Sequence, residues 1–229
     1  MVSDGRNPRP SGERSMKSES YELISARNKN VSLQAIGGHF VTQHSHVSHC
    51  IDLTKLKSET TSAKGAARLL AARFQTAPAD TVITLERTKM VGAFLAEELA
   101  FSGINVGKNF AVITPEITDD KLFLRDNLIP YVKHRRVLLL SATATTGITL
   151  KSALEGIIYY GGEPVGAAVL FGGSFGETVQ VGKFTVPVER LFSAEDVAGY
   201  ASYPANACPL CRAGKKVDAV VNSYGYSKL

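Results

Sequence analysis

Arg136-Val137-Leu138-Leu139-Leu140-Ser141-Ala142-Thr143-Ala144-Thr145-Thr146-Gly147-Ile148-Thr149 is the stretch of sequence that decides the fold. Its apolar run, Val137 to Leu140, is typical of a strand that is covered on both faces. After Gly147, apolar residues recur at helical spacing until Gly161 and Gly162 end the pattern. The stretch therefore predicts a buried strand, a turn from Ser141 to Thr149 and an amphipathic helix.

The turn between this strand and this helix has the chemistry of an anion site. Thr145, Thr146 and Thr149 supply hydroxyl donors. The start of the helix supplies unpaired N–H groups and the positive end of the helix dipole, which together favour a phosphate. A threonine-rich turn that only caps its own helix is the alternative. We prefer the phosphate site because the motif follows a strand and opens a helix.

Strands and helices alternate along the middle of the chain. We expect helices at 63–74 and 89–101, strands at 81–85, 110–113 and 164–171, and a short strand at 121–125 on a hairpin. This alternation predicts an α/β fold with a parallel sheet covered on both faces. Ligands of such sheets bind at the carboxyl ends of the strands, where the turns 85–89 and 141–149 fall. We expect 21–53 to be irregular.

Composition limits the class of protein. The 229 residues suit one α/β domain, and no apolar run reaches the roughly 18–20 residues of a membrane span. Residues 1–20 are polar and contain prolines, so we expect a disordered tail without a signal peptide, and Met16 is an alternative start. Three cysteines do not make a secreted disulfide framework, so we expect a cytoplasmic protein without a membrane partner. The net charge of +5 is spread along the chain, and we expect no nucleic-acid partner.

The opening stretch resembles the diphosphoribosyl-binding motif of the type I phosphoribosyltransferases. That motif has four apolar residues, two acidic residues, two variable residues, Thr-Thr-Gly, and then a small or hydroxyl residue. The apolar run, Thr145 to Gly147 and Thr149 match it. Ser141 and Ala142 stand at the two acidic positions, so the motif is degenerate.

Both ends of the chain resemble orotate phosphoribosyltransferases within this family. The matching segments are Gly38-His39-Phe40-Val41-Thr42 with His46, Cys50 to Leu53, Pro187 to Leu191, Tyr203-Pro204, and Cys208 to Gly214. A Ser-Gly step and a basic residue that some members carry near the first segment are missing. The resemblance covers roughly residues 22–216. It implies a type I phosphoribosyltransferase fold in a domain at 21–229, with a mostly parallel sheet, helices on both faces and a small hood built from about 21–60 and 185–229.

The resemblance also implies ligands and site residues. The expected ligand is 5-phosphoribosyl 1-diphosphate or a nucleoside monophosphate, with Mg²⁺ as cofactor and a homodimer as assembly. The expected residues are Thr143, Ala144, Thr145, Thr146, Gly147 and Thr149 for the phosphate, Ser141 and Ala142 for the ribose, and Arg87, Thr88 and Lys89 for the diphosphate. A solvated, charged helix start is the alternative for the last group.

The loss of the acidic pair leaves two functions open. Ser141 can still form a hydrogen bond, but Ala142 cannot. Each missing charge-assisted bond to ribose costs about 1.5–3 kcal/mol. The protein either transfers a phosphoribosyl group to a nitrogenous base such as orotate, in nucleotide synthesis or salvage, or is a catalytically inactive relative that binds a nucleotide or ribose phosphate for regulation. Lys121 and Arg125 are the candidate catalytic cations, although their segment is acidic and suits a surface hairpin better.

Histidines and cysteines near the two ends of the chain suggest a metal site. His46, His49, Cys208 and Cys211 would supply four zinc ligands if the two ends meet. The spacing of the histidines matches no known zinc finger. Buried thiols and surface histidines are the alternative.

Overall fold

A parallel core sheet forms the centre of the molecule. The computed structural model describes residues 20–222 and 225–229, so the predicted tail at 1–20 lies outside them except for Ser20. In spatial order the core strands are β10 (Thr178–Val181), β11 (Phe184–Ser193), β9 (Glu163–Gly172), β8 (Arg136–Ala144), β4 (Thr81–Thr84) and β5 (Ala111–Ile113). Neighbouring strands in it are parallel apart from the antiparallel pair β10 and β11, which confirms a mostly parallel sheet.

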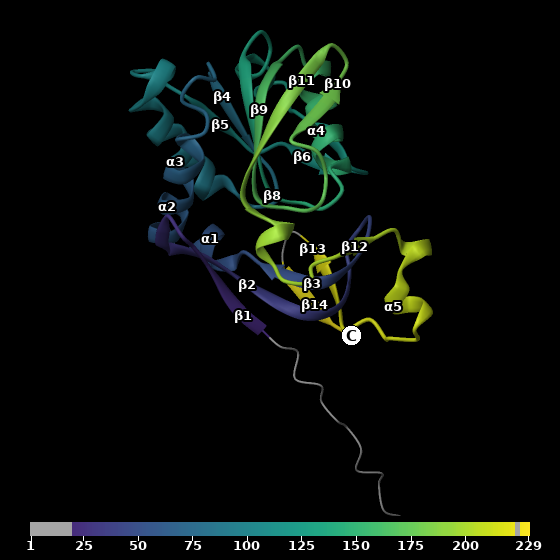
Figure 1. The fold of residues 1–229 in the computed structure, drawn as a ribbon. Helices are drawn as coiled ribbons and strands as arrows, with labels where there is room; N and C mark the ends of the chain where they lie inside the picture. The colour runs from purple at the N-terminus through teal and green to yellow at the C-terminus, as the bar shows by residue number, and fades with distance from the viewer. Residues whose placement is uncertain (1–19, 223–224) are drawn as a thin grey trace, which may run out of the picture.

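Helices cover both faces of this sheet because the central strand β8 is apolar on both sides. Leu138 and Leu140 pack in one cluster with α2 (Thr60–Ala71) and α3 (Lys89–Ala100). Leu139, one residue along, packs in the other cluster with α4 (Ile148–Tyr159). Figure 1 shows α2 and α3 on one side of the sheet and α4 on the other. The predicted helices on both faces are confirmed.

The strand β8 is longer than the sequence pattern predicts. Ser141 and Thr143 remain in the parallel ladder, opposite Val169 and Phe171 of β9. The connection to α4 is therefore only Thr145–Gly147, rather than a turn that begins at Ser141. Pairing with the equally long β9 explains the difference, because small polar residues continue a strand when a neighbour supplies the hydrogen bonds.

A second sheet, the hood, is built from the two ends of the chain. Its strands are β12 (Ser202–Tyr203), β3 (His46–Asp52), β2 (Asn28–Val41), β13 (Ala219–Asn222) and β14 (Gly225–Lys228), with β1 (Ser20–Ser25) paired to β2. The prediction that 21–53 is irregular is therefore wrong. Gly37, Gly38 and the histidines break the alternation that marks a strand. The strands β1, β2 and β3 pair as consecutive hairpins, whereas β12 and β13 join them from distant parts of the sequence.

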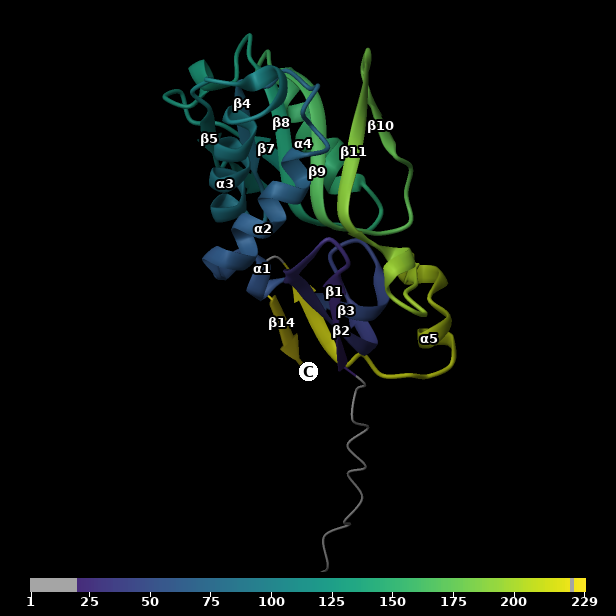
Figure 2. The same ribbon diagram turned by 60° about the vertical axis from the view of Figure 1, so that its left-hand side comes forward.

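The C-terminal part of the hood begins later than the predicted residue 185. The strand β11 pairs with β10 from Phe184 to Pro187 and with β9 from Val188 to Ser193, which places it in the core sheet. The hood receives its C-terminal strands only from Ser202 onward. Figure 2 shows the hood below the core sheet, with α1 (Thr54–Ser58) at the junction between them.

The remaining elements are short. They are the hairpin of β6 (Glu116–Thr118) and β7 (Lys121–Phe123), the helix α5 (Pro209–Arg212), and the 3₁₀ turns η1 (Gly103–Asn105), η2 (Ile129–Tyr131), η3 (Ala194–Asp196) and η4 (Ala205–Ala207). Across residues 20–222 and 225–229, no helix has the length and apolar character needed to cross a membrane.

The carboxylate of Asp80 ties together the amino ends of three core strands. It accepts hydrogen bonds from the Arg136 backbone N–H at 3.1 Å and from the Arg136 guanidinium at 2.8 and 2.9 Å, and Lys108 Nζ lies 3.3 Å away. The backbone of Asp80 also bonds Arg136 at the start of β8 and Ala111 at the start of β5. The bonds from the Arg136 side chain hold the pKa of Asp80 well below its usual range.

Replacing Asp80 by Asn should lower the free energy of unfolding by about 1–3 kcal/mol at neutral pH. Because the pKa of Asp80 is lower in the folded state, this stabilisation is fully present above the unfolded pKa of about 3.9 and is lost as the pH falls further. Urea titrations from pH 7 to pH 3 should therefore show the difference between wild type and D80N begin to shrink below about pH 4, with full loss only as the pH falls through the much lower folded pKa. A difference that stays constant to pH 3, or one that the exposed control Asp126→Asn reproduces, would contradict this account.

Candidate functional site

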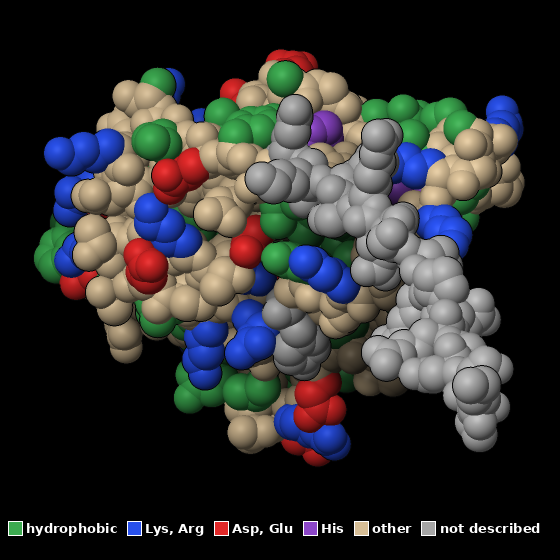
Figure 3. Space-filling view, turned by 90° about the horizontal axis from the view of Figure 1, so that it is seen from below, with side chains coloured by type: hydrophobic (Ala, Val, Ile, Leu, Met, Phe, Trp, Pro, Cys, Tyr) green, Lys and Arg blue, Asp and Glu red, His purple; other side chains and the backbone are tan. Residues whose placement is uncertain are grey.

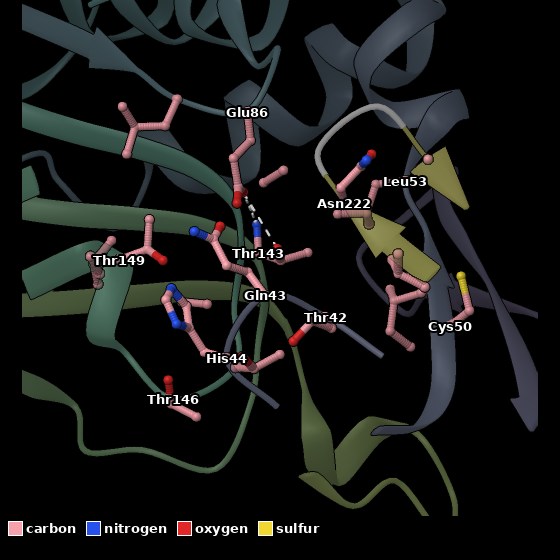
Figure 4. A pocket seen from close by; sticks show the side chains of 18 of the residues that line it. Thr42, Gln43, His44, Cys50, Leu53, Glu86, Thr143, Thr146, Thr149 and Asn222 are labelled. Carbon is pink, nitrogen blue, oxygen red and sulfur yellow. Dashed lines mark hydrogen bonds between the residues drawn. The ribbon is translucent and has the colours of Figure 1, made fainter. Parts of the chain in front are cut away.

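A cavity of about 270 Å³ lies between the hood and the carboxyl ends of the core strands. The hood contributes residues 42–44 of the β2–β3 turn, 50–54 after it, and residues 221–222 and 225–226 of β13 and β14. The core contributes Leu85 and Glu86 after β4 and the continuous run 142–150. Figure 4 shows the side chains of Thr143, Thr146 and Thr149 around this space, with those of the hood opposite.

The predicted phosphate-binding residues all line this cavity. They are Thr143, Ala144, Thr145, Thr146, Gly147 and Thr149. The helix α4 starts here without a side-chain cap, and the first N–H groups of a helix have no partner within it. Gly147 adopts a φ of 78°, a left-handed conformation that glycine takes without strain. The turn thus directs unpaired donors and a helix dipole toward the cavity, which suits an anion.

A second loop holds the phosphate turn in place. Gly173 lies so close to Thr145 that a Cβ atom at Gly173 would overlap the Thr145 carbonyl. Arg190 fixes this loop from behind, because its guanidinium donates to the carbonyls of Phe175 and Gly176 at 2.6 Å and stacks 4.3 Å from the Phe175 ring centroid. The turn is therefore positioned by close backbone packing as well as by its own sequence.

A carboxylate from the neighbouring strand occupies the other end of the cavity. Glu86, directly after β4, reaches across to β8 and accepts hydrogen bonds from Ser141 Oγ at 2.9 Å and from the Thr143 N–H at 2.8 Å, with Thr143 Oγ1 at 3.4 Å. All three contacts fall on Oε2, and none uses Oε1. Figure 4 shows Glu86 directed toward Thr143. A carboxylate is thus present beside the motif that lost its acidic pair.

The backbone at Glu86 is strained. Glu86 and Arg87 adopt φ values of 51° and 64°, in the left-handed region that costs a non-glycine residue roughly 1–2 kcal/mol. Hydrogen bonds to a charged acceptor contribute about 1.5–3 kcal/mol each, which is enough to offset that cost. Strain of this kind in folded proteins concentrates at ligand sites and active sites.

Comparison with known proteins identifies the architecture. No protein-family model matches the chain, and no curated protein matches it in sequence. Among solved structures, the orotate phosphoribosyltransferase of Mycobacterium tuberculosis H37Rv superposes with a TM-score of 0.51 at 17% identity, over 72% of this chain and 93% of that one. A phosphoribosyltransferase from Corynebacterium diphtheriae superposes with a TM-score of 0.50 at 18% identity, over 71% and 89% of the two chains. The chain has the type I phosphoribosyltransferase fold.

Within this phosphoribosyltransferase fold, Ser141 and Ala142 have different surroundings. Ala142 lines the cavity, as expected for a ribose-facing position. Ser141 is buried and does not line it, because its hydroxyl points to Glu86. The prediction that Ser141 faces the ribose therefore needs correction: this residue supports the carboxylate that lines the cavity.

The predicted diphosphate residues do not line the cavity either. Thr88 is fully buried, and its hydroxyl donates to the carbonyl of Leu85 at 2.7 Å. Arg87 and Lys89 are exposed, and of the turn 85–89 only Leu85 and Glu86 reach the cavity wall. The left-handed turn explains the difference, because it directs the Glu86 side chain inward where the resemblance placed the cations.

The candidate catalytic cations lie on the surface of the β6–β7 hairpin. Arg125 forms a two-pronged ion pair with Glu116 at 2.8 and 2.9 Å, and neither Arg125 nor Lys121 lines the cavity. The hairpin instead contributes Ile117 and Asp120 to the wall. Asp120 Oδ2 lies 3.4 Å from His44 Nε2 of the hood, in an alignment too poor for a hydrogen bond. The hairpin therefore closes one side of the cavity without bringing its cations to it.

Among the described residues, Lys57 of α1 is the one lysine that lines the cavity. Burial lowers the pKa of its ammonium group, and the nearby Glu86 carboxylate partly opposes that effect. A partly buried cation in the wall of the cavity favours an anionic ligand. The sequence does not predict Lys57 or Glu86 as site residues, because neither belongs to a recognisable motif. In the sequence, each is only a charged residue near a turn.

Three of the four predicted zinc ligands come together in the structure, and the fourth does not. His46, Cys208 and Cys211 come together with His39, and the four ligand atoms all lie within 4.8 Å of one another. His49 is not part of this cluster: its Nδ1 lies 2.9 Å from Ser48 Oγ, and its ring contacts Tyr200. His49 lies three residues from His46 along β3, so the two side chains point to opposite faces of the strand, whereas β2 brings His39 next to His46.

Acidic and basic side chains are mixed on the outer face of the hood. Figure 3 shows Lys and Arg beside Asp and Glu on the part of this face that belongs to the described residues and is not covered by the grey atoms.

Substitution of Gly173 by Ala should disturb the phosphate turn, because the added Cβ would overlap the Thr145 carbonyl. We expect G173A to lower the melting temperature and to weaken phosphate binding measured by calorimetry. Gly176→Ala is the matched control from the same loop, since its Cβ would meet the Thr178 backbone at ordinary contact distances, with O at 3.4 Å and N at 3.9 Å. Equal behaviour of the two variants would contradict the assigned packing.

Proposed function

We propose that the cavity binds the 5-phosphoribosyl group of 5-phosphoribosyl 1-diphosphate or of a nucleoside monophosphate. The observation that carries this proposal is the pairing of two groups across one cavity: a turn of unpaired donors at the start of α4 and the Glu86 carboxylate after β4. The first group suits a phosphate and the second suits sugar hydroxyls.

The phosphate would bind at the turn Thr145–Gly147 and at Thr149. Backbone N–H groups at the start of α4 and the threonine hydroxyls would donate to its oxygens, and the helix dipole would favour its charge. Lys57, which lines the same cavity, would add a positive charge. All of these groups belong to residues that line the cavity.

The ribose would bind at Glu86. A carboxylate accepts hydrogen bonds from two vicinal hydroxyls, the role that the acidic pair has in the motif that Ser141 and Ala142 interrupt. The contacts of Glu86 Oε2 with β8 fix the side chain, while Oε1 remains as a second acceptor. Glu86, which follows β4, would therefore supply the negative charge that is missing at positions 141 and 142 of β8.

The donor set of the cavity also fits Mg²⁺, which prefers carboxylate, hydroxyl and phosphate oxygens. Glu86, Asp52 and Asp120 present carboxylates at the cavity wall. These three carboxylates do not converge on one point among the described residues, so Glu86 would hold the ion together with ligand oxygens. When bound, Mg²⁺ would neutralise charge on a diphosphate leaving group.

Transfer of the phosphoribosyl group to a nitrogenous base such as orotate is the reaction that we propose. A carboxylate next to the sugar stabilises the positive charge that develops at the anomeric carbon, and Glu86 provides one. Regulation by nucleotide or ribose-phosphate binding without turnover is the second candidate. It is favoured because Arg87, Lys89, Lys121 and Arg125, the cations expected to hold the diphosphate or to act in catalysis, are all outside the cavity wall.

A homodimer is part of this proposal and rests on the resemblance alone. Light scattering coupled to size exclusion tests it: a mass of twice the 24.5 kDa chain supports a dimer, and a single-chain mass at the concentration of the activity assay contradicts it.

The proposal is tested by calorimetry and by a turnover assay. Titration with 5-phosphoribosyl 1-diphosphate, ribose 5-phosphate and uridine 5′-monophosphate in the presence of Mg²⁺ measures binding, and pyrophosphate release with orotate and a panel of other bases measures transfer. Turnover supports the enzyme, and binding without turnover supports the regulatory candidate. The absence of binding by all three ligands would contradict both.

Glu86→Ala should weaken binding of ribose 5-phosphate about 10- to 100-fold, which corresponds to the loss of one charge-assisted bond. Binding of inorganic phosphate should change much less, because the phosphate turn is intact. Glu97→Ala is the matched control: this carboxylate lies on α3, far from the cavity wall, and pairs with Lys64 at 3.7 Å. An equal loss for both ligands would show that the substitution disturbs the phosphate turn, and it would contradict a role of Glu86 that is specific to the ribose.

An acidic residue introduced at position 141 of β8 tests directly whether Glu86 takes the place of the acidic pair of the motif. Ser141→Asp should weaken ribose 5-phosphate binding in the wild-type background, because two carboxylates would then compete within hydrogen-bond distance of each other. The same substitution should strengthen binding in Glu86→Ala. If Ser141→Asp has the same effect in both backgrounds, the two positions do not share one role.

A further inference from the structure

A cluster of histidine and cysteine side chains lies in the hood, outside the phosphoribosyl cavity. It joins His39 and His46 of the N-terminal strands to Cys208 and Cys211 near the C-terminus. Cys208 and His39 are buried, His46 is half-buried and Cys211 is exposed. We propose that these four side chains bind a structural zinc ion.

The distances within the cluster are those of a tetrahedral site. Zinc bonds of about 2.3 Å to sulfur and 2.0–2.1 Å to nitrogen place sulfur and nitrogen ligands roughly 3.5 Å apart and two nitrogen ligands roughly 3.3 Å apart. His39 Nε2 lies 3.6 Å from both sulfur atoms, and Cys211 Sγ lies 3.3 Å from His46 Nδ1. The two nitrogen atoms are 3.0 Å apart. Small movements would bring all four to ideal positions.

The ring of His39 is oriented by a hydrogen bond on its other side. Its Nδ1 lies 2.8 Å from the carbonyl oxygen of Lys215, an acceptor only. The proton must therefore sit on Nδ1, which leaves the lone pair of Nε2 directed at the cluster. A backbone carbonyl that fixes a histidine tautomer in this way is a regular feature of zinc sites.

The backbone around His39 is also pinned. The N–H of His39 donates to Asp218 Oδ2 at 2.7 Å, and the N–H of Asp218 donates to the carbonyl of His39 at 2.8 Å. The register of β2 against β3 shifts between Gly37 and Phe40, so Gly38 and His39 together lie opposite one residue of β3. A bulge of this type redirects a side chain, and here the side chain is that of His39.

The two cysteines lie on a tight turn of the kind that binds zinc. Cys208 and Cys211 flank Pro209 and Leu210, which matches the short Cys-x-x-Cys spacing of zinc knuckles. The N–H of Arg212 donates to the carbonyl of Cys208 at 3.2 Å and closes this turn. Four protein ligands leave no open coordination position, so the site is structural rather than catalytic.

A redox-active cysteine pair is the competing interpretation of Cys208 and Cys211. It explains the two thiols, but it gives no reason for two histidine nitrogens to converge on them. Zinc accounts for all four groups. A zinc ion would also link segments about 170 residues apart in sequence. Such a link would stabilise a small sheet whose strands come from both ends of the chain.

Zinc at this position would anchor one wall of the cavity. His46 ends the β2–β3 turn, whose residues Thr42, Gln43 and His44 line the cavity. The inference does not depend on the ligand of that cavity, and metal content can be measured without it.

The test is elemental analysis of the full chain, purified under reducing conditions without chelator. We expect one zinc ion per chain, a loss of nearly all of it in Cys208→Ser and in His39→Asn, and full retention in the controls His49→Asn and Cys50→Ala. Retention by His39→Asn together with loss by His49→Asn would overturn the assigned ligand set. A wild-type protein that contains no zinc and takes up none on dialysis would overturn the proposal.

Cobalt substitution tests the geometry in the wild-type chain and does not depend on whether the variants fold. Tetrahedral Co²⁺ with two thiolates gives intense visible bands and a thiolate-to-metal charge-transfer band in the near ultraviolet. A weak octahedral spectrum without that band, or a Cys208–Cys211 disulfide found by mass spectrometry of the metal-free native protein, would overturn the zinc site. Removal of zinc by chelator should also lower the melting temperature of the full chain.

Discussion

The Glu86 carboxylate, held against β8 by the hydroxyl of Ser141 and the N–H of Thr143, is the interaction on which the proposed site depends. It exists because β4 and β8 are parallel neighbours, so both end at the same edge of the sheet. The turn after β4 adopts a left-handed conformation that costs free energy and directs Glu86 inward. Ser141, which interrupts the acidic pair of the motif, is also the donor that fixes this replacement carboxylate.

The cavity depends equally on the two ends of the chain. The core sheet supplies the phosphate turn and Glu86, but the opposite wall comes from β2, β3, β13 and β14. One end of the hood is anchored by Val31, Leu33 and Ala35 of β2, which pack in the main core cluster. The other end has a small core of its own, which contains Phe40, Val47, Cys50 and Ala219 among the described buried residues. A bound zinc ion between His39, His46, Cys208 and Cys211 would compensate for that small core, because metal binding contributes directly to folding.

Local patterns in the sequence were sufficient for the core and insufficient for the hood. The apolar run 137–140 and the helical spacing after Gly147 predicted β8, α4 and the position of the phosphate turn. The hood strands, the inward direction of Glu86 and the choice of His39 over His49 could not be predicted. The strands β1 to β3 pair with sequence neighbours, but a register shift between Gly37 and Phe40 interrupts the alternation, and β12 and β13 pair with distant segments. The direction of Glu86 and the position of His39 depend on backbone conformation, which leaves no local pattern. The roles of Arg87, Thr88 and Lys89 were inferred from family resemblance, and the different turn after β4 places them outside the cavity wall.

A crystal structure of the protein with 5-phosphoribosyl 1-diphosphate and Mg²⁺ tests the central claim most directly. The account predicts the 5′-phosphate at the N–H groups from Gly147 to Thr149, and the ribose hydroxyls within hydrogen-bond distance of Glu86. A ribose that contacts neither oxygen of Glu86, or a phosphate bound away from the start of α4, would contradict the account.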